Sequence, residues 1–238
     1  TGAVSLNTNG ATGDATVVNT IALDLAASVV GGNLVATATT GNLTDSGTVT
    51  VGGTGTFTTS GAGSDINLGT LAVTGVIALT TTAANGDATI VNTTGIDFAA
   101  SNVNGNLVAT ATTGNIVDTG AVTVTGTGSF TTTAAGGSIT LNSGLAVTGD
   151  IFVSTNGAGD VTLINATGID FVTASVVGQN LTATATTGDI TDVGTLTVGG
   201  TSTFTTTAAN NDITMDGLGS TGAVSLNTNG ATGDATVV

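Results

Sequence analysis

The sequence predicts an all-β fold, a right-handed parallel β-helix (β-solenoid) made of stacked coils. First, the stretch GNLVATATTGNIVDTGAVTV at 105–124 recurs in similar form at 32–51 and 179–198, which gives a unit of about 73 residues. Second, residues 1–18 return unchanged as 221–238, which gives a longer period of 220 residues. Third, short Val-, Ile- and Thr-rich segments alternate apolar and small polar residues, and no stretch keeps a helical period. Self-similarity of this kind is typical of repeat architectures.

The repeats divide the chain into units of one continuous solenoid over residues 1–238. The units are 1–73, 74–147 and 148–220, and residues 221–238 restart the first of them. Because this last copy stops within a unit, we expect the chain to be a window of a longer array. The right hand follows from the general preference of crossovers between parallel strands.

Spacing within a unit predicts three coils, and therefore nine coils in each 220-residue period. The first coil of each unit is about nine residues longer than the others and carries an additional segment. These segments, at 22–26, 95–99 and 168–172, are expected to form a ridge along the rod.

Stacking of equivalent positions predicts the core. Within a unit, a coil with Leu and Ala at two inward positions is followed by a coil with Gly or Ser and Phe there. Large beside small is what a close-packed interior requires. The predicted core residues are Leu34, Phe57, Leu107, Phe130, Leu181 and Phe204. One inward column is expected to run through all units as Val4, Leu34, Gly55, Ile77, Leu107, Gly128, Ile151, Leu181 and Ser202.

The charge balance restricts the partners. The chain has fifteen acidic residues, all Asp, and no Lys, Arg or His, so its formal net charge is -15. Without basic residues it lacks the groups that bind nucleic acid phosphates, and anionic membrane surfaces are disfavoured too. No run of 18 apolar residues is present, so no membrane insertion is expected in this segment. The carboxylates must be balanced by water, backbone amides or dissolved cations.

A column of polar residues opens the strand after the first corner of successive coils. Its members are Asp14, Asn42, Asp65, Asp87, Asn115, Ser138, Asp160, Asp189, Asp212 and Asp234. One interpretation is that these side chains cap the turn by binding backbone amides. The other is capture of Ca²⁺ between stacked carboxylates, with Asp14, Asp65, Asp87, Asp160, Asp189 and Asp212 as candidate ligands. The GGxGxD run of calcium β-rolls does not occur.

The other recurring aspartates have simpler interpretations. Simple alternation would point Asp45, Asp118 and Asp192 inward, so we expect the strand to end there and each Asp to form an Asx turn. The outer face of the additional segments carries Asp24, Asp97 and Asp170, which we expect to be solvated.

Catalysis is not expected. Aspartate pairs occur in glycosidases, but no His, Lys, Arg, Tyr or Glu is present to divide acid and base roles. Threonine runs such as 131–133 raise ice binding as a lower alternative, although Thr also suits strands in general. Cofactors other than Ca²⁺ are not indicated.

GNLVATATTGNIVDTGAVTV and GSITLNSGLAVTGDIFV resemble the repeat regions of large bacterial exoproteins of the filamentous haemagglutinin type, which two-partner systems secrete. The resemblance covers the whole chain and implies a right-handed β-helix in a surface-attached fibre or adhesin. The family's secretion and cell-binding regions are absent from this stretch, so no functional residue is carried over. We expect the non-catalytic shaft of an extracellular fibre, which continues end to end with further copies and can bundle laterally. An adhesin stalk or a surface sheath that binds Ca²⁺ is the alternative.

Overall fold

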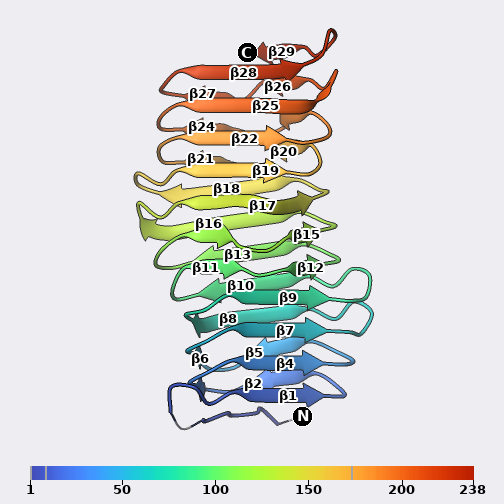
Figure 1. Cartoon of the computed structure of the whole chain (residues 1–238), viewed down its shortest axis with the longest axis vertical. Helices are drawn as coiled ribbons and strands as arrows, with labels where there is room; N and C mark the ends of the chain where they lie inside the picture. Colours follow the sequence, from blue (N-terminus) through green and yellow to red (C-terminus); the bar gives the residue numbers. More distant parts are fainter. Residues whose placement is uncertain (1, 9, 173) are drawn as a thin grey trace.

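The chain winds into a tall stack of about eleven turns, with roughly 21 residues in each turn (Figure 1). This is a computed structural model, and it describes residues 2–8, 10–172 and 174–238. All pairings between its named strands are parallel, and no helix occurs among the described residues. The predicted all-β parallel solenoid is therefore confirmed.

Two parallel sheets run the length of the stack. Sheet 1 has thirteen strands. They are β1 (Ala15–Asn19), β4 (Leu34–Ala38), β7 (Gly55–Thr59), β9 (Ile77–Thr81), β11 (Ile96–Phe98), β12 (Ser101–Val103), β14 (Ile116–Asp118), β15 (Val122–Val124), β17 (Ile139–Val147), β19 (Val161–Asn165), β22 (Leu181–Ala185), β25 (Ser202–Ala209) and β28 (Val224–Asn229). Sheet 2 has sixteen. They are β2 (Leu23–Leu25), β3 (Ser28–Val30), β5 (Leu43–Asp45), β6 (Val49–Val51), β8 (Ile66–Val73), β10 (Ala88–Asn92), β13 (Leu107–Ala111), β16 (Gly128–Ala135), β18 (Ile151–Asn156), β20 (Ile169–Phe171), β21 (Ser175–Val177), β23 (Ile190–Asp192), β24 (Leu196–Val198), β26 (Ile213–Met215), β27 (Leu218–Ser220) and β29 (Ala235–Val237).

Alternation along each strand separates core from surface. In β13, Leu107, Ala109 and Ala111 are fully buried, whereas Val108 and Thr110 face outward. The strands are short because Gly, Asn, Asp and Thr at the corners end them after three to nine residues. The result is one continuous core inside the two sheets.

Within a unit, the core has the register that the sequence predicts. Leu34 lies opposite Gly55, and Ala36 lies opposite Phe57 in the next turn. A Cβ atom on Gly55 would lie 2.8 Å from the Phe57 ring, so the glycine leaves the space that the ring fills. The other units repeat this arrangement with Leu107 beside Gly128, Ala109 beside Phe130, Leu181 beside Ser202, and Ala183 beside Phe204. The Phe and Leu side chains of these pairs are at most 1% exposed.

The predicted column does not continue from one unit to the next. Ile77 pairs with Phe98, not with Leu107. Three turns above Leu34 the chain is at Phe98, and a further half turn brings it to Leu107 in the opposite sheet. A unit therefore makes three and a half turns, and the expectation of three coils per unit and nine per period is wrong. A 220-residue period makes about ten and a half turns.

The additional segments account for this half turn and do not form a ridge. They are the strands β2, β11 and β20, each of which pairs within a sheet. In each of these strands, the side chains on either side of the central Asp are at most 1% exposed, as Ile96 and Phe98 are in β11. Phe98 also packs across the core against Phe130 of sheet 2, edge to face, with ring centroids 6.5 Å apart.

Successive units consequently occupy opposite sides of the rod. Leu34 and Leu181 lie in sheet 1, and the equivalent Leu107 lies in sheet 2. The same holds for the 220-residue period, because Val4 bridges to Leu25 of sheet 2 whereas the identical Val224 lies in sheet 1. Each surface feature of a unit thus alternates between the two faces.

Candidate functional site

The polar residues before the strands bind backbone amides of the following turn. The Asp87 N–H donates to Asp65 Oδ1 at 2.9 Å, and the Asn106 N–H donates to Asp87 Oδ1 at 2.6 Å. The capping interpretation therefore describes these contacts, although the amide belongs to the next turn and not to the residue's own turn. Each such bond joins two turns outside the strands.

The half turn divides these residues into four separate ladders, so the single column expected from the sequence is wrong. They are Asp14, Asn33 and Thr54; Asn42, Asp65, Asp87, Asn106 and Thr127; Asn115, Ser138, Asp160, Asn180 and Thr201; and Asp189, Asp212 and Asp234. The sequence pattern did not predict three members of these ladders, Asn33, Asn106 and Asn180. Their signal is Asn directly before the L-V/T-A-T-A strand in every unit.

The six candidate Ca²⁺ ligands are thus distributed over all four ladders. Asp65 neighbours Asp87, and Asp189 neighbours Asp212, which brings two pairs of carboxylates onto consecutive turns. Asp14 binds the Asn33 amide, and Asp160 accepts from both the backbone and side-chain nitrogens of Asn180. Across the described ranges, no three His, Cys, Asp or Glu side chains form a group that could hold a metal ion.

Asp45, Asp118 and Asp192 end their strands as expected, but they bind the next turn and do not form local Asx turns. Asp45 accepts from the N–H groups of Gly69 and Thr70, at 2.9 and 2.8 Å. The equivalent aspartates of the other two units make the same contacts. In the second unit Asp118 accepts from the N–H groups of residues 142–143, and in the third unit Asp192 accepts from those of residues 216–217. Each carboxylate thus holds the bend between the two short segments of the turn above.

Burial raises the pKa of Asp192, and this effect exceeds the opposing one of the hydrogen bonds from the Gly217 and Asp216 backbone. The charges of Asp216 and Asp170 raise the pKa further. Gly69 and Asn142 stand where the third unit has Asp216, so the third unit is the most acidic at this bend.

Two fully buried asparagines join adjacent units. Asn92 Oδ1 accepts from the Val73 N–H, and its Nδ2 donates to the carbonyl oxygens of Val73 and Gly95. Asn165 makes the same contacts with Val147 and Gly168. Neither residue was predicted from the sequence. Their signal is the Asn that ends the segments TVVN, TIVN and TLIN, directly after two apolar residues.

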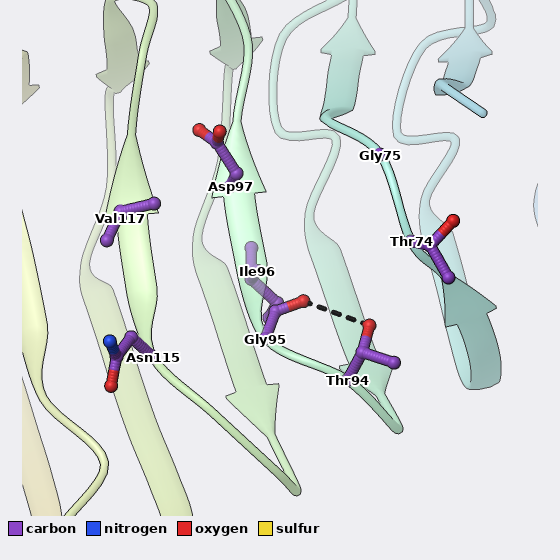
Figure 2. A pocket seen from close by; sticks show the side chains of 8 residues that line it. All are labelled: Thr74, Gly75, Thr94, Gly95, Ile96, Asp97, Asn115 and Val117. Carbon is purple, nitrogen blue, oxygen red and sulfur yellow. Dashed lines mark hydrogen bonds between the residues drawn. The ribbon is translucent and has the colours of Figure 1, made fainter. Parts of the chain in front are cut away.

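A shallow groove opens at the junction of the first and second units (Figure 2). Its volume is about 440 Å³, and it lies between the chain at Thr74 and Gly75 and the start of β11. It forms because β11 pairs with β9 only at Phe98, so the preceding residues are not joined to the turn below. In Figure 2 the Thr94 hydroxyl donates to the Gly95 carbonyl oxygen at 3.3 Å.

The groove recurs at the equivalent residues of the next junction, with a volume of about 250 Å³. Its lining residues are Thr148, Gly149, Asp150, Gly168, Ile169, Asp170, Asp189 and Thr191. Because of the half turn, β20 lies in sheet 2 whereas β11 lies in sheet 1. One groove per junction therefore appears on alternating faces.

The outward aspartates of the additional segments are half-buried rather than freely solvated. Asp97 and Asp170 line the two grooves. Asp97 Oδ1 accepts from the Thr119 hydroxyl at 2.9 Å, and Asp24 Oδ1 accepts from Thr44 at 3.5 Å. Asp170 Oδ1 is buried and has no hydrogen-bond partner within the part of the chain that the structure describes.

The 73-residue unit corresponds to a known family of repeats. Residues 12–80, 85–151 and 158–238 match the family described as repeats of unknown function, DUF5649. The chain belongs to this family. The three DUF5649 matches begin 73 residues apart, so they follow the same unit as the structure. No curated protein and no solved structure matches the chain. Among the described residues, no helix has the length and apolar character needed to cross a membrane.

Proposed function

We propose that these DUF5649 repeats form the shaft of a long extracellular bacterial fibre, in which the rod provides length and stiffness without catalysis. The observation that carries the proposal is the way in which the repeat restarts. Ser202 pairs with Val224 and Phe204 with Leu226, so the new copy stacks on the preceding turn through continuous strand pairing. The array can therefore continue without any new type of contact.

The stacking gives the rod a defined length for each residue added. Strands in a sheet lie about 4.8 Å apart, so ten and a half turns extend the rod by about 50 Å for each 220-residue period. In a solenoid, each turn contacts only the turn before it and the turn after it. The proposed partner is accordingly a further copy of the same repeat, placed end to end, with lateral bundling of rods as an addition.

The resemblance to filamentous haemagglutinin-type exoproteins supports a bacterial cell-surface location. The absence of Lys and Arg supports it as well, because a chain without them offers no site to proteases that cleave after basic residues. The uniform rod also supports a spacer more than a receptor-binding tip.

The test compares the 238-residue chain with a chain that carries one additional 220-residue period. Electron microscopy and small-angle scattering are expected to show rods whose length differs by about 50 Å at unchanged width. Equal lengths, or a wider and more compact particle, would contradict the shaft. Images of native material separate single fibres from the lattices of a sheath.

A cation-binding adhesin stalk or sheath is a second candidate. It is favoured by Asp65 and Asp87, which lie on consecutive turns of a chain without any basic residue. Melting with CaCl₂ and with a chelator tests it, because a Ca²⁺-bound state would raise the midpoint.

Ice binding has less support. The outward column Thr37, Thr58 and Thr80 spans only three turns and then meets Asn102. The next such column, with Thr110 and Thr131, lies in the opposite sheet. Because of the half turn, neither face carries a long uninterrupted threonine array.

A further inference from the structure

We propose that two copies of this chain join head to tail by segment exchange, in which the last segment of one copy (residues 221–238) replaces the first segment of the other (residues 1–18). The inference rests on the proposed shaft, and it assigns the residues through which separate rods join. Exchange of an identical element between copies is a low-cost route to association.

The two identical segments lie at opposite ends of the rod and pair through opposite edges (Figure 1). In the first segment, Ala15–Asn19 pairs with β4 of the turn above. In the last segment, Val224–Asn229 pairs with β25 and Ala235–Val237 with β26, both of the turn below. The same sequence is thus seen with a neighbour on each of its edges, so one segment can hold both neighbours at once.

The bend inside the segment has the same hydrogen bond in both places. The Thr8 hydroxyl donates to the Gly13 carbonyl oxygen at 2.8 Å, and the Thr228 hydroxyl donates to that of Gly233 at 3.0 Å. Thr8 Oγ1 also accepts from the Gly31 N–H of the next turn at 3.0 Å. Thr228 Oγ1 is therefore oriented to accept from Gly31 of a second copy without a change in its own turn.

The outer end of the last segment exposes side chains that belong to the core elsewhere. Val224 and Val237 are 41% and 42% exposed, whereas the equivalent Ile77 and Ile90 of the second unit are fully buried. A second copy that stacks on this end covers both valines. Burial of this apolar surface stabilises the association.

The first segment is held less firmly than the last one. Its residues 2–8 reach the next turn through isolated bridges at Val4 and Asn7, whereas the identical stretch of the last segment forms the paired strand β28. Exchange leaves the number of paired edges unchanged, because the last segment of one copy takes over the partners of the other copy's first segment. The released segment gives up only partly buried apolar side chains and regains conformational freedom.

The joined rods also continue a polar ladder. The Asp234 N–H donates to Asp212 Oδ1 at 2.9 Å, and in the first segment the equivalent Asp14 Oδ1 accepts from the Asn33 N–H at 2.7 Å. At the junction one aspartate makes both contacts, so the ladder of Asp212 and Asp234 continues into Asn33 of the second copy. Because β29 then lies beneath β4, sheet 1 of the second copy continues sheet 2 of the first.

The experiment uses engineered thiols, because the chain contains no Cys. Asn7 bridges to Val29, and residues that face each other on neighbouring turns lie about 4.8 Å apart, within reach of a disulfide. At the proposed junction Asn227 takes the place of Asn7. Asn227→Cys and Val29→Cys chains, mixed at high concentration and oxidised, are therefore expected to form a mixed dimer joined between positions 227 and 29, which mass spectrometry identifies.

Val108→Cys is the matched control for Val29→Cys, because Val108 also faces outward but lies in β13, in the middle of the rod. The mixed dimer of Asn227→Cys with Val29→Cys is expected in about tenfold higher yield than that with Val108→Cys, since only the junction holds two thiols in disulfide geometry. Equal yields would mean random collision and would overturn the proposal.

The double variant Asn7→Cys, Val29→Cys tests the release of the first segment. When it is oxidised, its disulfide holds residues 1–18 to their own chain, so electron microscopy is expected to show single rods. Reduction is expected to let these rods join end to end. Equal joining in both states would overturn the exchange. Rods that never join would also overturn it but leave the shaft in place, whereas compact particles would contradict both.

Discussion

The side-chain amide of Asn92 binds both backbone groups of Val73, with 2.9 Å to its N–H and 2.9 Å to its carbonyl oxygen. Val73 ends β8, at the junction where the next unit moves to the opposite sheet. The amide thus replaces the strand pairing that the half turn interrupts. A buried backbone group needs such a partner.

Replacement of Asn92 by Ala is expected to destabilise the chain by about 1–3 kcal/mol, because it leaves the buried N–H of Val73 without an acceptor, whereas the Thr94 hydroxyl still donates to the Val73 carbonyl oxygen. Urea unfolding followed by circular dichroism measures the change. Asn19→Ala is the matched control. Asn19 is half-buried, and among the described residues its side chain binds only the Ala22 carbonyl oxygen. An equal loss in both variants would contradict the junction role of Asn92.

Phe130→Ala is expected to cost about 3–5 kcal/mol, since it opens a cavity beside Gly128 and removes the contact with Phe98. Phe152→Ala serves as the control, because Phe152 is the one phenylalanine outside the buried core. It is expected to change the unfolding midpoint much less. Similar midpoints for the two variants would mean that the Phe130 ring is not in the core.

Asp87 distinguishes capping from cation binding. Asp87→Asn keeps an oxygen that can accept from the Asn106 N–H, so the melting temperature is expected to stay equal or to rise as repulsion from Asp65 decreases. Asp87→Ala loses the acceptor and is expected to cost about 1–3 kcal/mol. Melting with CaCl₂ or chelator is expected to be the same for the native chain and Asp87→Asn. A Ca²⁺-dependent rise that Asp87→Asn abolishes would instead establish a cation site.

Asp192 predicts a specific pH dependence. Because its pKa in the folded state is raised above the usual 3.8, the folded state holds more protons than the unfolded state between 3.8 and the raised value. This residue's contribution to stability is therefore present at low pH and is lost as pH rises through that window. As pH rises through this window, the urea midpoint of the native chain is therefore expected to fall relative to that of Asp192→Asn, which has no carboxyl group to titrate.

Asp216→Asn is the control for Asp192. Removal of this neighbouring charge is expected to lower the pKa of Asp192. The pH range over which the stability depends on Asp192 then becomes narrower. A difference between the native chain and Asp192→Asn that does not change with pH would contradict the assignment.

Local patterns predicted the strands and their packing within a unit. Alternation of apolar and polar residues marks each strand, and the Leu–Gly and Ala–Phe pairs join turns that are close in sequence. The candidate site was predicted in part. The polar residues before the strands were recognised, but their division into four ladders and the grooves at the junctions were not. Both result from pairings between units, which the sequence period does not reveal.

By itself, the sequence determined that this protein is a stacked β-repeat with a 73-residue unit and an acidic surface that lacks any basic group. Only the tertiary structure decided how many turns a unit makes. A segment such as Gly95–Ala99 has the same alternation whether it forms an outer ridge or a strand. Burial of Ile96 and Phe98, together with the Asn92 amide, favours the strand, and the resulting half turn places successive units on opposite faces.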